Sequence, residues 1–154
     1  ARALAEHPRC TGFVLGTNDL AKELRAPLIR GRSNLVPHLA TAVVSARAAG
    51  IVILDGVFND IKDTEAFEAE CRQGLELGFD GKTLIHPAQI EICNSTWSPS
   101  KSDIEHAKKV ISAFTAAEAE GAGVVTVDGR MIENLHVENA QRVLAVDEAI
   151  AQRS

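Results

Sequence analysis

The sequence predicts an α/β fold in which short parallel strands alternate with helices. Three short apolar runs indicate the strands, at residues 12–16, 51–54 and 82–85. Uninterrupted runs of this length are typical of strands buried on both faces of a parallel sheet. Between the runs lie two helical patterns, residues 35–49 and 64–77, and each is followed by a glycine, as helix ends commonly are. This alternation favours βαβ units.

A polar stretch at residues 94–100 divides the chain. We expect the strands and their helices in residues 1–93, and a C-terminal extension in residues 101–154. The extension is predicted to consist of a helix over 102–120, a hairpin arm at 124–130 and a last helix over 134–152. Ser102 and Glu105 have the spacing of a capping box at the start of the long helix.

Composition excludes several classes of protein. The 154 residues are 45% hydrophobic and 24% charged, the balance of a globular protein, and no apolar run is long enough to cross a bilayer. The net charge of −5, without a cluster of Lys and Arg, argues against nucleic acid as a partner. The three cysteines form no CxxC pair and are predicted to be reduced thiols of a cytoplasmic protein.

Polar residues follow each predicted strand, at the sheet edge where parallel α/β folds bind ligands. Asp19 follows the first strand, where its carboxylate is able to bind Mg²⁺. The alternative is that Asp19 or Asn18 caps a helix beginning at Leu20. Both interpretations stay open on spacing alone.

The second and third strands end in further candidates. Asp55 is placed to orient a substrate or to support the ion from outside its coordination sphere, whereas Asp60 and Asp63 are expected to begin and solvate the next helix. After the third strand come the remaining candidates for anion binding, Lys82, His86 and Pro87, beside the N-terminus of a short helix. The alternative for His86 is a hydrogen-bonded structural role.

Four ordered blocks resemble one family. They are Gly-Thr-Asn-Asp-Leu at 16–20, Ile-Leu-Asp-Gly-Val at 53–57, Gly-Phe-Asp-Gly-Lys-Thr-Leu-Ile-His-Pro-Ala-Gln-Ile at 78–90, and Asp-Gly-Arg-Met-Ile-Glu at 128–133. Together they are similar to the citrate lyase β-subunit / malyl-CoA lyase superfamily, the HpcH/HpaI aldolases. The third block is the most specific.

The resemblance implies the C-terminal part of a TIM (β/α)₈ barrel, with strands six to eight in residues 1–93 and the extension in residues 101–154. The earlier strands, a metal-binding glutamate and a substrate-binding arginine of the family have no counterpart here. Asp19 matches a Mg²⁺ ligand, and residues 81–89 are expected near the CoA nucleotide, with Asp55, Lys82, His86 and Pro87 as the substrate or CoA-binding set.

The resemblance also implies a catalytic role for Glu133. In this family an aspartate after Met-Ile acts on a neighbouring subunit as acid or base, and the matching residue here is Glu133, one methylene longer. Without the family, Glu133 is a residue at a helix N-terminus. Asp128 is a second catalytic candidate, with a turn residue of the hairpin as its alternative.

Three functions follow from these features. The first is a magnesium-dependent lyase that cleaves a 3-hydroxyacyl-CoA such as malyl-CoA into acetyl-CoA and a 2-oxo acid. The second is a thioesterase that hydrolyses the same class of CoA ester, which the longer side chain of Glu133 favours. The third is a non-catalytic fragment, because the first half of the barrel is absent. We expect a homo-oligomer, a trimer or hexamer, with no membrane or nucleic-acid partner.

Overall fold

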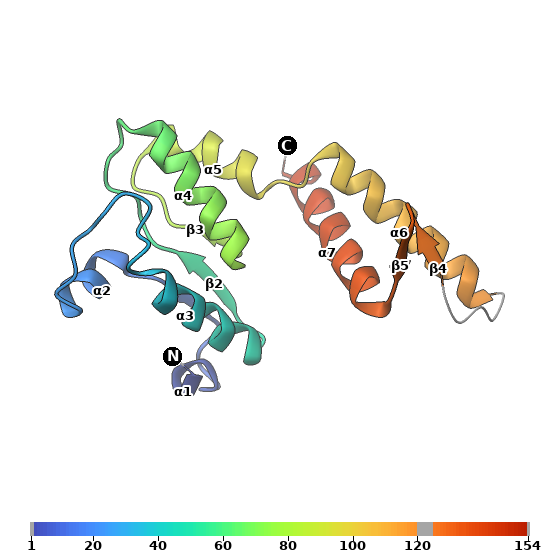
Figure 1. The fold of residues 1–154 in the computed structure, drawn as a ribbon, viewed down its shortest axis with the longest axis horizontal. Helices are drawn as coiled ribbons and strands as arrows, with labels where there is room; N and C mark the ends of the chain where they lie inside the picture. Colours follow the sequence, from blue (N-terminus) through green and yellow to red (C-terminus); the bar gives the residue numbers. More distant parts are fainter. Residues whose placement is uncertain (1, 120–124, 154) are drawn as a thin grey trace. The chain divides into compact units, whose positions relative to one another are not determined.

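The computed structural model describes residues 2–119 and 125–153, and the chain divides into two units, Ala1–Trp97 and Ser98–Ser154. The first unit contains a parallel sheet in the order β1–β2–β3, formed by Gly12–Val14, Val52–Asp55 and Gly81–Lys82 (Figure 1). The predicted α/β class is confirmed. The third strand is shorter than predicted, because the backbone N–H of Ile85 bonds to the Gln89 side chain, 3.1 Å away, instead of a neighbouring strand.

Helices connect and follow these strands. Their bounds are Arg2–Ala5 for α1, Thr17–Glu23 for α2, Val36–Ala48 for α3, Thr64–Leu77 for α4 and Ile90–Trp97 for α5, with a short 3₁₀ helix, η1, at Pro87–Gln89. Asp63 caps α4 by accepting a 3.0 Å hydrogen bond from Ala66 N–H, and Gly78 ends the helix at φ 96°. Asp60 instead accepts a hydrogen bond from Lys62 N–H in the preceding loop, so only Asp63 begins the helix.

The pleat of the sheet separates its side chains into two faces. Phe13 is paired with Ile53, and both contact the apolar core formed with α2 and α3. Further along the same face, Asp55 is paired with Lys82, and α4 packs against β3. Successive residues of a strand point to opposite faces. The helices therefore cover the face that carries Ile53 and Asp55.

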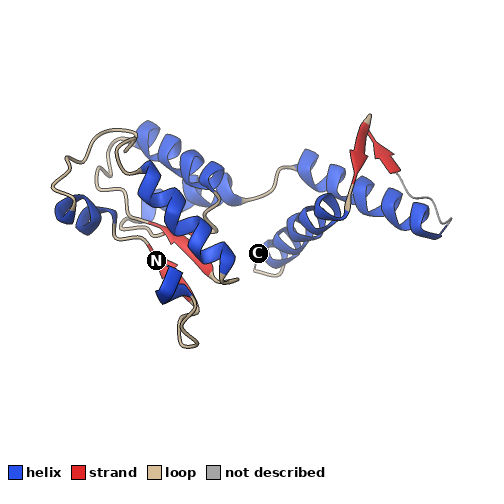
Figure 2. Ribbon diagram, turned by 60° about the horizontal axis from the view of Figure 1, so that its bottom comes forward, coloured by secondary structure: helices blue, strands red, loops and turns tan. Residues whose placement is uncertain are grey.

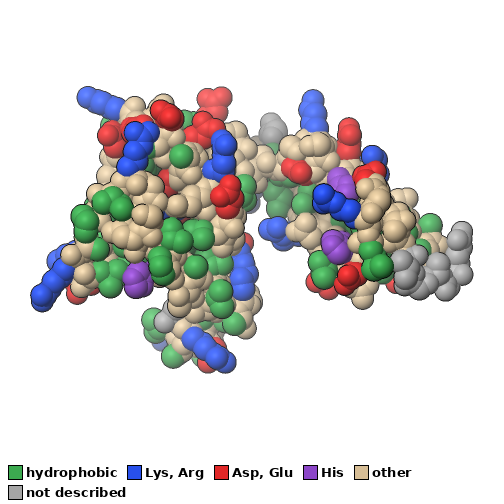
Figure 3. Space-filling view, viewed as in Figure 1, with side chains coloured by type: hydrophobic (Ala, Val, Ile, Leu, Met, Phe, Trp, Pro, Cys, Tyr) green, Lys and Arg blue, Asp and Glu red, His purple; other side chains and the backbone are tan. Residues whose placement is uncertain are grey.

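The opposite face of the sheet is apolar and uncovered. Val14 is 64% exposed and Val52 is 52% exposed, and Leu54, on the same face, is paired with Val14 in the register of β1 and β2. In the part of the chain that the structure describes, β1 and β3 each pair along one edge only. Hydrophobic side chains also reach the surface of the first unit in Figure 3. Exposed apolar faces and free strand edges favour association.

The second unit is a helical pair with a hairpin. Helix α6, Lys101–Ala119, packs on α7, Asn134–Ala151, and the hairpin of β4, Val125–Val127, and β5, Arg130–Ile132, lies between them in the chain (Figure 2). The unit has its own apolar core around Ala107, Val110, Val127, Ile132 and Ala140. Residues 120 and 124, expected in the first helix and in the hairpin, lie outside the described residues.

Two local predictions in this unit have clear outcomes. The expected capping box at Ser102 and Glu105 is wrong, because the cap lies two residues earlier and α6 begins at Lys101. The backbone N–H and the hydroxyl of Ser100 donate to the Asp103 carboxylate, and the Asp103 N–H donates to the Ser100 hydroxyl. Those bonds from the Ser100 side chain and backbone lower the pKa of Asp103. Asp128 is the turn residue of the hairpin, at φ 50°, followed by Gly129 at φ 76°, as a type I′ turn requires. None of the described helices is long and apolar enough to span a bilayer.

We predict that residues 1–154, produced alone, associate through the uncovered sheet face. A double change of Val14 and Val52 to Lys places charge on that face and should lower the association, measured as mass against concentration by light scattering. Val44→Lys is the matched control, because Val44 is 69% exposed on α3 and lies away from the sheet. A mass that stays monomeric for the unaltered chain at all concentrations contradicts the prediction.

Candidate active site

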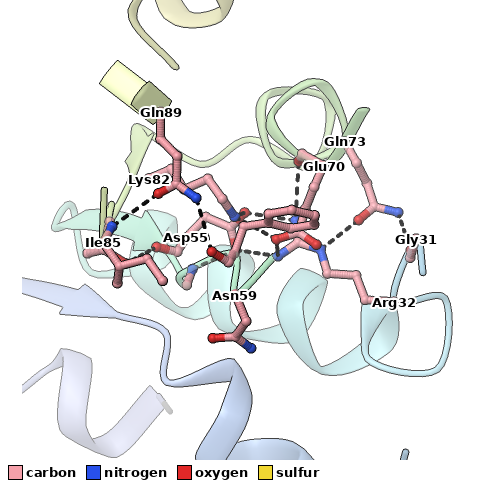
Figure 4. Close-up of polar contacts among 12 residues, drawn as sticks. Gly31, Arg32, Asp55, Asn59, Glu70, Gln73, Lys82, Ile85 and Gln89 are labelled. Carbon is pink, nitrogen blue, oxygen red and sulfur yellow. Dashed lines mark hydrogen bonds and ion pairs between the residues drawn. The ribbon is translucent and has the colours of Figure 1, made fainter. Parts of the chain in front are cut away.

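A buried cluster of charges lies where β2 ends. The carboxylate of Asp55, 0% exposed, accepts two hydrogen bonds from the guanidinium of Arg32, at 2.6 and 2.7 Å, and one from the ammonium of Lys82 at 3.0 Å. The Lys82 ammonium also donates to Glu70 at 2.7 Å. Figure 4 shows these side chains converging from different elements. Two cations face two carboxylates, so the charges of the cluster balance.

The position of Gly74 on α4 makes room for this cluster. A Cβ at residue 74 would lie 2.9 Å from Oδ2 of Asp55 and 3.4 Å from the ring of Trp97. A glycine inside a helix normally weakens it. Here it lets α4 approach the sheet closely enough for Glu70 to reach Lys82.

Arg32 fixes the long loop between α2 and α3. Its side chain is 5% exposed, and its backbone has φ 40°, an uncommon conformation for a residue with a Cβ. The Arg32 Nε–H donates to Gln73 at 2.8 Å, and the Gln73 side chain donates to the carbonyl of Gly31 at 3.0 Å. The loop is therefore held at its middle by side chains of the helix layer.

Asp19 lies in the open, unlike Asp55. Helix α2 begins at Thr17 with Gly16 as its N-cap, so the alternative that Asp19 or Asn18 caps a helix beginning at Leu20 is wrong. Asp19 occupies the first turn of α2 and is exposed. Among the described residues, none donates a hydrogen bond to its carboxylate or forms an ion pair with it. This carboxylate is thus available to an external cation.

The donor set fits a magnesium ion in part. Mg²⁺ in proteins is commonly held by one or two carboxylates together with water and substrate oxygens. No group of three or more His, Cys, Asp or Glu residues able to hold a metal is present in the described ranges. Among the described residues, the exposed carboxylate of Asp19 at the end of β1 is thus the candidate ligand that the sequence predicted.

The loop after β2 contacts both the loop after β1 and the loop after β3. Its contacts with the loop after β1 are close. Gly56 lies so close to the end of β1 that an added Cβ would be 2.6 Å from both the Leu15 carbonyl and Oγ1 of Thr17. Next to it, the side chains of Asn18 and Asn59 exchange hydrogen bonds at 3.1 and 2.8 Å.

The β3 side of this arrangement depends on Gln89. The Gln89 side chain is buried and donates to the carbonyl of Phe58 at 3.1 Å (Figure 4). Its oxygen accepts the Ile85 N–H described above, which fixes the segment before η1. A cavity of about 340 Å³ opens beside these loops, lined by residues that include Asn18, Arg30 and Phe58.

The proposed CoA-contact residues have different surroundings. Lys82 and Asp55 are buried on the helix-covered face of the sheet, and any additional chain can only bury them further. Neither side chain therefore has an exposed surface that could contact a ligand directly. His86 and Pro87 are exposed at the start of η1. Nδ1 of His86 accepts a 3.2 Å hydrogen bond from Ala88 N–H, which is the structural role expected as its alternative.

Glu133 is exposed at the N-cap of α7. Its backbone N–H donates to Nδ1 of His136 at 3.0 Å, which fixes the backbone at the helix start. This is the position that the helical alternative for Glu133 predicts, and it leaves the carboxylate at the surface. Asp128 lies 3.4 Å from Nδ1 of His106, so the hairpin turn contacts α6.

Sequence reasoning missed the residues that support this site. Arg32 and Glu70 belong to segments that the strand-end rule does not inspect, whereas Asn59 and Gln89 lie in the inspected segments but were not singled out. Gly74 carried a usable signal, because a glycine within a helical pattern often marks a close packing contact. The pairing of Asp55 with Arg32 and Lys82 carried none, since these partners lie 23 and 27 positions away in the chain.

We predict that Asp55→Asn lowers the free energy of unfolding by about 3–5 kcal/mol, because it leaves Arg32 and Lys82 buried without full compensation. Urea unfolding followed by circular dichroism measures the change. Asp60→Asn is the matched control, since Asp60 is exposed and lies in the loop that follows β2; it should change stability by less than about 0.5 kcal/mol. Equal effects of the two changes would show that the cluster does not stabilise the unit.

Comparison with known proteins identifies the family. The model of the HpcH/HpaI aldolase/citrate lyase family matches residues 1–87. A (3S)-malyl-CoA thioesterase from Cereibacter sphaeroides is 52% identical over 151 residues, which cover 98% of this chain and 53% of the relative. The citrate lyase β-subunit of Haemophilus influenzae is 37% identical over 136 residues, covering 88% of this chain and 47% of the relative. The chain spans about half the length of these relatives.

Solved structures agree with this assignment. CitE from Mycobacterium tuberculosis, in complex with magnesium, acetoacetate and coenzyme A, matches with a TM-score of 0.74 and 27% identity over 92% of this chain and 53% of its own. A citrate lyase from Burkholderia xenovorans, at 18% identity and a TM-score of 0.80, supports the fold alone and covers 97% of this chain and 49% of that one. Magnesium, expected from the sequence, is thus present in a solved relative. The chain belongs to the HpcH/HpaI aldolase/citrate lyase family.

Proposed function

We propose that the complete protein is a magnesium-dependent thioesterase that hydrolyses malyl-CoA or a closely related 3-hydroxyacyl-CoA. The observation that carries this proposal is the 52% identity to a (3S)-malyl-CoA thioesterase, which extends over nearly the whole chain. Identity to the citrate lyase β-subunits is lower, at 37% and 34%. Hydrolysis, the second of the functions expected from the sequence, therefore takes first place.

The fold of the first unit supports a place in a larger barrel. We propose that β1, β2 and β3 are strands six to eight of a TIM barrel, with the uncovered face of Val14 and Val52 turned to its interior. In such barrels helices cover the outside of the sheet, and active sites lie at the carboxyl ends of the strands. Asp19 follows the carboxyl end of β1, and Asp55 lies on the helix-covered side. In this placement Asp19 is able to bind a ligand, whereas Asp55 supports the sheet.

Asp19 is proposed to hold the magnesium ion together with ligands from outside residues 1–154. The ion, when bound, would polarise the substrate oxygens that it contacts. Asp55 and Lys82 are proposed to act indirectly, by fixing β2 and β3 beneath the strand-end loops. His86 and Pro87, both exposed, remain our proposed contacts for the CoA moiety.

Glu133 is proposed to act as the general base that takes a proton from the attacking water. Hydrolysis then adds the water oxygen to the thioester carbonyl and releases CoA as its thiol, with the acid as the second product. Its exposed carboxylate at the N-cap of α7 is compatible with this role. We propose that it acts on a neighbouring subunit of a trimer or hexamer. The free thiols Cys10, Cys71 and Cys93 support a cytoplasmic location.

Citrate lyase β-subunit relatives and the CitE structure with coenzyme A favour a second candidate, a carbon–carbon lyase. The two reactions give different products from malyl-CoA. A thioesterase releases malate and free CoA, whereas a lyase releases glyoxylate and acetyl-CoA. We predict malate and CoA from the intact protein, with thiol release and glyoxylate measured in parallel. Glyoxylate formed in equal amount to substrate consumed would overturn the thioesterase proposal.

A change in the side-chain length of Glu133 tests its proposed role in thioester hydrolysis more directly. Glu133→Asp shortens the side chain by one methylene, and a displacement of about 1 Å is able to cost on the order of 10²-fold in rate. We expect thiol release to fall by at least about 10-fold while the protein remains folded. Glu138→Asp, a change of an exposed glutamate within α7, is the matched control and should leave the rate unchanged.

We predict that Asp19→Asn abolishes magnesium-dependent turnover and leaves the unfolding midpoint nearly unchanged, because it removes ligand charge at an exposed position. Magnesium titration by calorimetry, with turnover at limiting Mg²⁺, measures the effect.

Asp60→Asn is the control for a change of charge in a nearby loop. Unaltered turnover at limiting Mg²⁺ would exclude Asp19 as a ligand, and absence of both magnesium and acetyl-CoA binding in the unaltered protein would favour the non-catalytic alternative.

Mixing two inactive proteins shows whether Glu133 acts in its own subunit or in a neighbouring one. If it acts on a neighbouring subunit, Asp19→Asn protein and Glu133→Gln protein should regain activity when their subunits exchange. Some subunit contacts then combine an intact Asp19 with an intact Glu133. Failure to regain activity in demonstrably mixed oligomers would place Glu133 in its own subunit or remove it from the reaction.

A further inference from the structure

Helix α2, which carries Asp19, is too short to hold its own position. It has seven residues, and its N-cap is Gly16, which has no side chain that could bond to the first turn. Isolated helices shorter than about 12–15 residues are marginal in water, even when their residues favour a helix. The position of the Asp19 carboxylate therefore depends on contacts between the first turn of α2 and other parts of the chain.

The loop after β2 supplies two such contacts. Thr17 is 5% exposed and packs on Gly56, where an added Cβ would lie 2.6 Å from its Oγ1 and 2.7 Å from its Cγ2. The next residue, Asn18, pairs its amide with that of Asn59, and each amide donates one hydrogen bond and accepts one, at 3.1 and 2.8 Å. Both contacts hold the backbone directly before Asp19.

The loop that carries Asn59 is itself firmly held. The Gly56 N–H donates to the Asp55 carboxylate at 2.8 Å, and the buried Gln89 side chain donates to the Phe58 carbonyl at 3.1 Å. The side chain of Asn59 points away from the buried charges around Asp55 (Figure 4). Asn59 thus presents its amide to α2 from a loop that is fixed on both sides of the sheet end.

We propose that Asn59 is a positioning residue for the magnesium site, which acts by holding Asn18 and, through it, the carboxylate of Asp19. This inference rests on the proposed function, in which Asp19 binds the ion. Mg²⁺ requires nearly octahedral geometry, with oxygen ligands at about 2.0–2.1 Å, so a small displacement of a ligand weakens binding. Both amides are neutral. Their removal therefore changes the position of Asp19 and leaves the charge around the ion unchanged.

The test measures magnesium binding to the complete protein after Asn59→Ala. We expect the affinity for Mg²⁺ to fall on the order of 10-fold, as it commonly does when a group that orients a metal ligand is removed. Calorimetry with Mg²⁺ alone and the magnesium dependence of thiol release both report this change. Turnover at saturating Mg²⁺ should be retained, because the ligands themselves are intact. Unchanged magnesium affinity in folded Asn59→Ala protein would overturn the proposal.

Asn34→Ala is the matched control. Its amide donates to the Pro27 carbonyl at 2.9 Å in the loop after α2, so this change also removes an asparagine hydrogen bond from the same connection between strands. It should leave the affinity for Mg²⁺ unchanged. An equal loss of affinity in Asn34→Ala and Asn59→Ala would overturn the specific role of Asn59.

A double-mutant cycle tests whether the two amides act as a pair. Asn18→Ala should lower the affinity for Mg²⁺ as much as Asn59→Ala, and the double variant should lose no more than either single one. Independent effects would instead multiply to about 100-fold and overturn the proposed pair. The unfolding midpoint is measured in parallel, and a lowered midpoint with unchanged affinity would show a structural role only. If one single variant does not fold, comparison of the other with Asn34→Ala decides.

Asp19→Asn, titrated with Mg²⁺ in the same series, separates this inference from the proposed function. If Asp19→Asn binds Mg²⁺ as tightly as the unaltered protein, Asp19 is not a ligand, and the proposed metal site and the positioning role both fail. If Asp19→Asn loses binding but Asn59→Ala and Asn18→Ala do not, the metal site stands and only the positioning role of Asn59 is overturned.

Discussion

The first unit depends on the burial of one carboxylate, that of Asp55, between two cations. Transfer of such charges from water costs several kcal/mol each, and only close, well-directed partners offset that cost. Arg32 supplies a bidentate contact from the loop after α2, and Lys82 supplies the third bond from β3. The same lysine binds Glu70 of α4. A loop, two strands and a helix are thereby held in one geometry, and no partner is replaceable without leaving a charge unpaired.

This interaction also explains why Asp55 and Asp19, which follow neighbouring strands, have different roles. The pleat directs Asp55 and Lys82 towards the helices, where they support the strands, and leaves Asp19 exposed after β1. A carboxylate already saturated by Arg32 and Lys82 has little capacity for another cation, whereas the Asp19 carboxylate has no partner among the described residues. The physical distinction between a structural acid and a ligand acid is thus burial with satisfied hydrogen bonds, rather than residue type.

Local signals in the sequence were enough to predict β1, β2, α3 and α4, because glycine boundaries and apolar periodicity act over a few residues. They were not enough for the ends of elements. From spacing alone Asp19 also fitted a helix cap, until Gly16 proved to hold that position. Strand β3 stopped early because Gln89 accepts a hydrogen bond from a backbone N–H that a longer strand would use.

Contacts between distant segments were beyond any local pattern. The Asp55 cluster arises only when α4 packs on its neighbours, and periodicity carries no information about which polar residues then meet. The family resemblance pointed to Asp19 and Glu133 through their motifs. It could not separate Asp55 and Lys82 from residues that face a ligand, since a motif records residue order and not the face on which a side chain lies.

The tight fit of Gly56 against Leu15 and Thr17 has a consequence for protein engineering. Because the loops after β1 and β2 touch with no space for a single extra methyl group, neither is an independent module. Transplanting one loop from a homologue to alter substrate preference would bring in side chains shaped for a different neighbour. The two loops therefore form the smallest exchangeable block, and chimaeras that divide them should lose expression or solubility before any change in specificity is measurable.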